Sequence, residues 1–253
     1  MEMQYYKWYS QALNRDMEFK IYGHGGRPVL FIPCQDGRFF DFENYKMIDV
    51  WAPWLESGQV MVCAVDTIDK QTWSNEYGDP RWRIERHEQW IRHITDEIVP
   101  FFREVVNNHN GWSGYPGVIT FGCSLGATHA ANLFYRRPDL FDGLLALSGI
   151  YSAEYGFGSY MDDLVYANSP VHYLGGMPND HHYIELYNMK KAVICVGQGP
   201  WELPETTRSM QRIFEAKGIH HWVDFWGYDC SHDWYWWYRQ VEYFVPYLLG
   251  LEE

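Results

Sequence analysis

The sequence is short of basic residues, of cysteine and of long apolar runs, and each shortage excludes a class of protein. Lysine and arginine number 20 against 33 aspartates and glutamates, so the formal net charge is −13. A chain with this charge repels phosphate backbones and anionic lipid surfaces, and we therefore expect no nucleic-acid partner. No apolar run reaches the length of about 18 residues that marks a membrane helix, so we expect no membrane span and no membrane partner.

The beginning of the chain and its cysteines bear on where the protein works. Residues 1–7 lack the cationic segment and apolar run of a signal peptide, so we expect none. The 5 cysteines are an odd, scattered set, and most lie in or beside apolar runs. This favours reduced thiols over a disulfide framework, and we expect a cytoplasmic protein. The sequence leaves open whether the chain forms a homo-oligomer.

Short apolar runs alternate with stretches of helical periodicity, which is typical of an α/β protein with a mostly parallel sheet. We predict strands at residues 4–9, 17–22, 29–33, 60–65, 117–122, 143–148, 192–196 and 221–226, the first two antiparallel. We predict helices, on both faces of the sheet, at 41–56, 86–107 (bent near Pro100), 125–136, 203–217 and 234–248. The irregular segment 150–188 is long enough to act as a partial lid. No repeat or linker interrupts the chain, so we expect a single domain over residues 1–253.

Residues 118–126 carry the most informative motif. They read Val-Ile-Thr-Phe-Gly-Cys-Ser-Leu-Gly, a G-x-S-x-G pattern between a strand and a helix of small residues. The turn is so sharp that Ser124 must adopt a strained backbone, and a side chain at Gly122 or Gly126 would collide with a neighbouring strand or helix. In return the hydroxyl of Ser124 stands clear of the sheet, beside the positive end of the following helix. We therefore predict that Ser124 is a nucleophile.

A serine nucleophile needs a base, and His232 stands where this architecture places it, on a loop between the last strand and the last helix. Adjacent His181 and His182 point apart, and no second pair completes zinc spacing, so we expect no metal site. The remaining candidates are His87, His93, His129, His220 and His221. We interpret the first three as surface or packing residues, and we expect the last two at the end of the sheet opposite the active site.

The third member of a triad is a carboxylate that accepts the Nδ1 proton of the histidine and fixes its tautomer. Glu202 is the first carboxylate after the strand 192–196, and it gives the chain order Ser, Glu, His. We predict Glu202 as this acid. The alternatives that remain open are Glu205, Asp229, Asp233, Asp162 and Asp163.

Together these residues resemble the putative-esterase family of α/β-hydrolases, which includes S-formylglutathione hydrolases, enterochelin esterases, feruloyl esterases and mycolyltransferases. The resemblance is carried by residues 122–127, 137–143, 148–149, 197–203 and 231–237, and it covers roughly residues 17–248. The stretch Gly197-Gln-Gly through Glu202-Leu203 is similar to the mycolyltransferase loop with the acidic triad residue. The stretch from Ser231 to Trp237 is similar to the family's histidine and tryptophan-bearing helix. The resemblance implies an α/β-hydrolase fold, but it does not name a substrate.

The oxyanion hole of such an enzyme needs two backbone N–H donors. The first is expected at Leu125, directly after the nucleophile. The second is expected in the loop after strand 29–33, which reads Pro33-Cys-Gln-Asp-Gly37 where relatives begin with His-Gly, Asp-Gly or Ser-Gly. Pro33 has no N–H, so we predict Gln35 as the second donor.

Several residues are candidates for a substrate pocket. Arg38 adjoins the oxyanion loop and could meet an anionic substrate, although acidic neighbours could neutralise it. Trp73 and Trp82 flank the polar loop after strand 60–65, at the expected active-site end of the sheet, and aromatic rings there suit an acyl or aromatic ester. We expect most tryptophans of the last helix to pack in the core.

These features predict a serine carboxylic-ester hydrolase that acts on a small or aromatic ester through an acyl-enzyme, with no cofactor. An acyltransferase that uses the same triad is the alternative. A non-catalytic binding protein on a hydrolase scaffold is a second alternative, disfavoured because all three triad positions hold competent residues.

Overall fold

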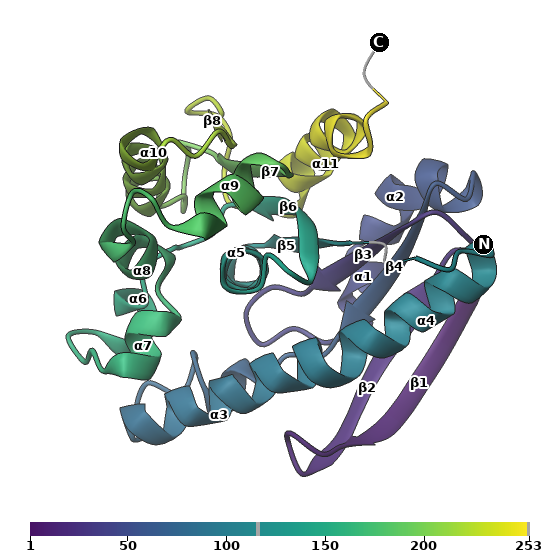
Figure 1. The fold of residues 1–253 in the computed structure, drawn as a ribbon, viewed down its shortest axis with the longest axis horizontal. Helices are drawn as coiled ribbons and strands as arrows, with labels where there is room; N and C mark the ends of the chain where they lie inside the picture. The colour runs from purple at the N-terminus through teal and green to yellow at the C-terminus, as the bar shows by residue number, and fades with distance from the viewer. Residues whose placement is uncertain (115–116, 252–253) are drawn as a thin grey trace.

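The computed structural model describes residues 1–114 and 117–251 and is built on one eight-stranded sheet (Figure 1). The strands lie in the order β1-β2-β4-β3-β5-β6-β7-β8. The β1–β2 and β2–β4 pairs are antiparallel, and all other neighbours are parallel. The strands are β1 Met3–Ser10, β2 Arg15–Tyr22, β3 Arg27–Ile32, β4 Val60–Val65, β5 Val118–Cys123, β6 Phe141–Leu147, β7 Lys191–Val196 and β8 Trp222–Phe225. The predicted mixed sheet is confirmed.

Helices cover both faces of this sheet, because its central strands are apolar along both faces. Every residue of β4 and β5 is buried. One face packs against α2 (Met47–Glu56) and α11 (Trp234–Leu249), and the other packs against α4 (Val99–Asn110), α5 (Leu125–Arg136) and α10 (Glu205–Lys217). Figure 1 shows α2 and α11 on one side of the sheet, with α5 and α4 on the other.

Two predicted helices differ from the observed ones. The stretch 41–56 forms two helices, α1 (Asp41–Asn44) and α2, because Lys46 has a left-handed backbone with φ of 55°. The stretch 86–107 belongs to a longer helical run that starts with α3 (Pro80–Arg92), where the Asp79 side chain caps the first turn. A π-helical turn, His93–Ile98, joins α3 to α4, and Pro100 at the second position of α4 cannot donate to the helical ladder.

The segment 150–188, expected to be irregular, contains four short helices. These are α6 Glu154–Phe157, α7 Asp163–Ala167, α8 Pro170–Gly176 and α9 His182–Asn188. Contacts with the rest of the molecule hold them in place: Arg83 of α3 donates to the carbonyl of Gly156, and the N–H of Tyr151 donates to Thr206. Helices this short are not stable alone, so the local sequence pattern did not reveal them.

All five cysteines are free thiols, and four of them are buried, which agrees with the expectation from their spacing. Over the described residues, no helix combines the length and the apolar character that crossing a membrane requires.

Candidate active site

Ser124 lies at the sharp turn between β5 and α5. Its backbone has φ of 57° and ψ of −129°, outside the regions that ordinary residues prefer. A Cβ at Gly122 would come closer than 3.0 Å to the backbone of Gly126, and a Cβ at Gly126 would come equally close to the carbonyl of Ile32. The two glycines therefore let α5 approach β5 and β3, which is the geometry that the motif predicts.

The structure brings Ser124, His232 and Glu202 into one hydrogen-bonded line. The Nε2 atom of His232 is 2.9 Å from Oγ of Ser124, and its Nδ1 atom is 3.1 Å from Oε2 of Glu202. These residues come from three separate loops at the carboxyl ends of β5, β7 and β8. The His232 side chain is 24% exposed and that of Glu202 only 1%, so the line runs from the surface into the interior.

The Glu202 carboxylate also accepts hydrogen bonds from two groups for which the sequence predicted no role. Its Oε1 atom accepts from the hydroxyl of Ser148 at 2.6 Å and from the N–H of Gly197 at 3.3 Å. The indole N–H of Trp237 donates to Ser148 at 3.0 Å, so the Ser148 proton is directed at Glu202. The Ser-Gly pair after β6 was visible in the sequence, but no spacing rule connects it to an acid so far along the chain.

Among the described contacts, none of the alternative acids forms a hydrogen bond with the ring of His232. Glu205 is exposed on α10 and Asp229 is exposed on the loop before His232. Asp233 caps the first turn of α11 by accepting from the N–H of Trp236. Asp162 and Asp163 form ion pairs with Arg81.

The other histidines have structural neighbours of their own. The Nδ1 atom of His221 is 2.9 Å from the hydroxyl of Tyr135, and its Nε2 atom is 3.0 Å from the carbonyl of Tyr187. The expectation that His181 and His182 point apart is wrong, because their rings stack on each other at the start of α9. Within residues 1–114 and 117–251, no three His, Cys, Asp or Glu side chains are grouped so as to hold a metal ion.

Two backbone N–H groups near Ser124 lack protein acceptors. Leu125 begins α5, and its N–H donates to no acceptor in the described part of the chain. The same holds for the N–H of Gln35 on the loop after β3. That loop turns back on itself, because the N–H of Gly37 donates to the carbonyl of Cys34 at 2.8 Å. Both donors that the sequence predicted are thus available for hydrogen bonding.

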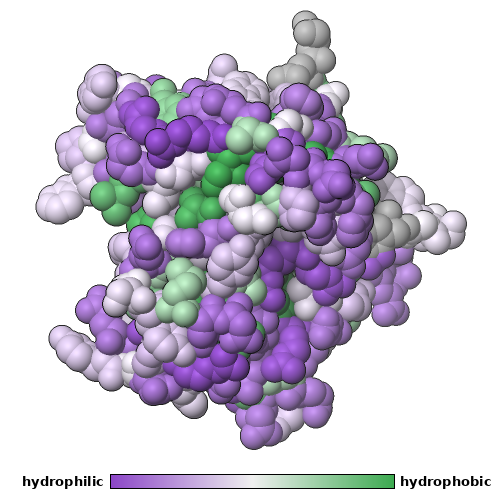
Figure 2. Space-filling model, turned by 60° about the vertical axis from the view of Figure 1, so that its left-hand side comes forward, coloured by the Kyte–Doolittle hydropathy of each residue, from purple (hydrophilic) through white to green (hydrophobic). Residues whose placement is uncertain are grey.

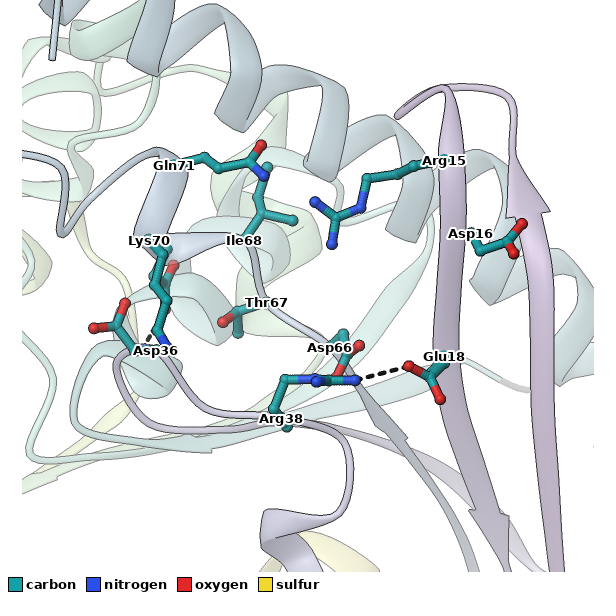
Figure 3. A pocket seen from close by; sticks show the side chains of 11 residues that line it. Arg15, Asp16, Glu18, Asp36, Arg38, Asp66, Thr67, Ile68, Lys70 and Gln71 are labelled. Carbon is teal, nitrogen blue, oxygen red and sulfur yellow. Dashed lines mark hydrogen bonds and ion pairs between the residues drawn. The ribbon is translucent and has the colours of Figure 1, made fainter.

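Arg38 lines a cavity of about 330 Å³ beside the oxyanion loop (Figure 3), but its charge is already neutralised. Its guanidinium donates to Asp66 and to Glu18, both at 2.8 Å. The hydrogen bond from Arg38 to Asp66 is the main reason that the pKa of Arg38 is raised. The charge of Arg38 is therefore neutralised as the sequence suggested. The acids that neutralise it, Glu18 and Asp66, are however distant from Arg38 in the sequence.

The two candidate pocket tryptophans lie in different settings. The Trp73 side chain is only 4% exposed and packs with Leu125 and Phe157, so it lies against the start of α5 and offers little surface to a substrate. The polar residues that flank Trp73 in the sequence indicated an accessible ring, whereas the structure shows a buried one. Trp82 is 49% exposed on α3, where its backbone N–H donates to the capping carboxylate of Asp79.

The segment that contains α6 to α9 contacts the loop after β3. The hydroxyl of Tyr155 lies 3.5 Å from Oε1 of Gln35, so α6 reaches the oxyanion loop. Figure 2 turns the left-hand side of Figure 1 forward, and it shows apolar side chains gathered in a hollow between polar margins. Exposed apolar side chains of this segment are Tyr155, Met161 and Tyr166.

Comparison with known proteins agrees with this architecture. Solved structures that share the fold include a ferulic acid esterase (TM-score 0.73, 14% identity, 99% of both chains covered). An S-formylglutathione hydrolase from Agrobacterium tumefaciens gives a TM-score of 0.71 at 13% identity, with 98% of this chain and 93% of that chain covered. The ferulic acid esterase of Anaeromyces mucronatus gives 0.68 at 12% identity, with 98% and 91% covered.

At such low identities these structures establish the fold alone, and no curated protein sequence matches this one. The sequence model of the family described as Putative esterase matches residues 10–243, nearly the whole chain. The chain therefore belongs to the putative esterase family of α/β-hydrolases, and it is an esterase.

Proposed function

We propose that this esterase is a serine hydrolase whose catalytic residues are Ser124, His232 and Glu202. The observation that carries the proposal is the continuous hydrogen-bonded line from the Ser124 hydroxyl through both ring nitrogens of His232 to a buried carboxylate. A carboxylate at Nδ1 keeps the proton on that nitrogen and leaves Nε2 free to accept one. The strained backbone of Ser124 and the start of α5 are the usual companions of such a nucleophile.

The chemistry proceeds in two halves. His232 takes the proton of Ser124 while Oγ bonds to the ester carbonyl carbon, and the carbonyl electron pair moves onto oxygen. The pair then returns, the bond to the alkoxide leaving group breaks, and His232 donates its proton to that alkoxide. Water next adds to the acyl carbon with His232 as base. The bond to Oγ breaks, the acid leaves, and Ser124 recovers its proton.

The negative oxygen formed in each half needs donors that point at it. The N–H groups of Leu125 and Gln35 support this role, since neither has an acceptor among the described residues, and they lie at the start of α5 and on the loop after β3. Such donors contribute most when they are fixed before the reaction begins.

The proposed substrate is a small or aromatic ester, and the segment 150–188 is proposed to act as a partial lid over it. The contact of the Tyr155 hydroxyl with Gln35, on the loop after β3, supports this assignment. All the elements that carry the three catalytic residues extend from one sheet, which supports a single domain. Five free thiols support a reducing compartment such as the cytoplasm.

The experiment is to treat the protein with a fluorophosphonate probe and then with a panel of p-nitrophenyl and feruloyl esters. Wild type should be labelled at Ser124, and Ser124→Ala should lose label while kcat falls roughly 10⁴-fold with the fold intact. Labelling of a different residue would refute the assignment. Adding alcohols as acceptors tests the transferase alternative, because ester products would then exceed free acid.

A further inference from the structure

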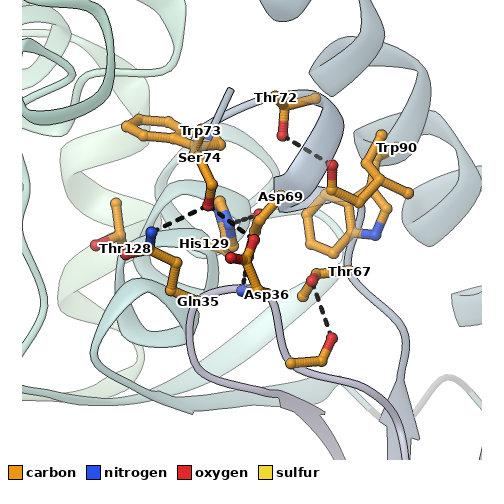
Figure 4. Close-up of polar contacts among 12 residues, drawn as sticks. Gln35, Asp36, Thr67, Asp69, Thr72, Trp73, Ser74, Trp90, Thr128 and His129 are labelled. Atoms are coloured by element: carbon orange, nitrogen blue, oxygen red, sulfur yellow. Dashed lines mark hydrogen bonds and ion pairs between the residues drawn. The ribbon is translucent and has the colours of Figure 1, made fainter. Parts of the chain in front are cut away.

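A buried carboxylate, Asp69, connects the nucleophile helix to the oxyanion loop (Figure 4). One oxygen of Asp69 is 2.9 Å from Nε2 of His129, in the second turn of α5. Its other oxygen accepts from the backbone N–H of Asp36 at 3.2 Å, directly after the proposed donor Gln35. Asp69 and His129 are 2% and 1% exposed, so water does not compete for these bonds.

The surrounding contacts restrain the same two loop residues. The hydroxyl of Ser74 donates to the carboxylate of Asp36 at 2.8 Å and accepts from the side-chain amide of Gln35 at 3.0 Å. The N–H of Ser74 donates in turn to the carbonyl of Asp69 at 2.9 Å. Asp36 itself has φ of 60°, a conformation that costs a residue with a side chain free energy and needs such restraints.

His129 has no other polar partner in the described structure. Its Nδ1 atom is buried without a hydrogen bond, and the rings of Trp73, His87 and Trp90 surround it at centroid distances of 5.0 to 5.7 Å. Burying an imidazole and a carboxylate costs free energy, and within the described residues neither forms an ion pair with arginine or lysine, so their mutual bond and the N–H of Asp36 must offset that cost. The one bond between them fixes the orientation of the Asp69 carboxylate.

We propose that Asp69 and His129 are positioning residues for the oxyanion hole: they fix the Asp36 peptide, and with it the N–H of Gln35, relative to Ser124. The inference rests on the proposed serine mechanism. Both ends of the bridge matter, because α5 carries Leu125 and the loop carries Gln35, and the two donors must converge on one oxygen. A shift of about 1 Å in such a donor can lower a rate by roughly 100-fold.

The test compares variants that break the bridge with variants that preserve it. Asp69→Ala and His129→Leu remove it. Asp69→Asn preserves it, because the amide oxygen accepts from Asp36 while the amide N–H donates to His129 in its other tautomer. His87→Phe is the matched control, since it changes a buried histidine of the same cluster that makes no bond to the loop.

Three quantities separate positioning from mere stability: kcat, KM, and the Ki of a trifluoromethyl ketone that forms a tetrahedral adduct on serine. In Asp69→Ala and His129→Leu, kcat should fall and Ki should rise by the same factor, roughly 10- to 100-fold, with KM within about twofold. Asp69→Asn should stay near wild type. His87→Phe should lower Tm without changing kcat or Ki.

The inference is overturned if Asp69→Ala changes kcat and Ki no more than His87→Phe does at a comparable loss of Tm. Should the buried variants fail to fold, Ser74→Ala cuts the outer restraints alone. Its kcat and Ki should move together by roughly 3- to 10-fold, and unchanged values would equally count against the inference. A wild type that neither cleaves esters nor reacts with fluorophosphonate would instead refute the proposed function, so the two failures are distinguishable.

Discussion

Replacing Glu202 by glutamine tests the proposed acid, because the structure dictates which way the new amide will point. Ser148 and Gly197 both donate to Oε1, and Trp237 directs the Ser148 proton there. In Glu202→Gln the amide oxygen must remain at that position to accept these bonds. The NH₂ group then faces Nδ1 of His232.

An N–H donor at Nδ1 forces the proton of the neutral ring onto Nε2, the atom that must accept the Ser124 proton. His232 thereby loses its ability to act as a base, while the glutamine side chain keeps the shape of Glu202. We expect kcat to fall by up to roughly 10⁴-fold, which is about 5 kcal/mol of transition-state stabilisation. KM should change little and the thermal midpoint should stay close to that of wild type, since the side chain remains buried and hydrogen-bonded.

The assay is steady-state hydrolysis of the best ester from the panel, with thermal unfolding measured on the same samples. Glu205→Gln is the matched control, because Glu205 is a rival acid on the same segment and its side chain is 82% exposed. It should retain activity within about twofold. Near-normal kcat in Glu202→Gln, together with a severe loss in Glu205→Gln or Asp229→Asn, would refute the assignment.

Three further predictions follow from the site and the core. Gly126→Ala places a methyl group against the Ile32 carbonyl and should lower the free energy of unfolding by at least about 2 kcal/mol in urea titration, whereas Gly114→Ala, which meets open space, should be nearly neutral. Burial lowers the pKa of His221 from 6.5 to about 4, so the unfolded chain binds a proton that the folded protein refuses. Stability should therefore decline as pH falls from 6.5 to 4, by up to about 3 kcal/mol, and His221→Gln should remove that part of the decline. Incubation with EDTA should leave esterase activity unchanged, and a loss that zinc restores would contradict the serine mechanism.

Local sequence patterns were sufficient for most of the fold because each pattern reports a local physical requirement. Continuous apolar runs predicted the central strands, since a parallel strand covered on both faces can carry little else. The pattern G-x-S-x-G predicted Ser124, because close approach of α5 leaves no room for side chains at the two glycines. Short helices such as α6 and α7 were missed, since tertiary contacts and not local periodicity hold them.

What the sequence by itself determined was a set of candidate residues and their order: a serine on a strained turn, a histidine before the last helix, and several acids that could complete a triad. Only the tertiary structure favours one of the candidate acids, because among the described residues Glu202 alone contacts both His232 and the Ser148 hydroxyl. The same holds for the Asp69–His129 bridge, whose members are far apart in the sequence and share no spacing rule. Hydrogen bonds between distant residues depend on how the elements pack, and that information is not local.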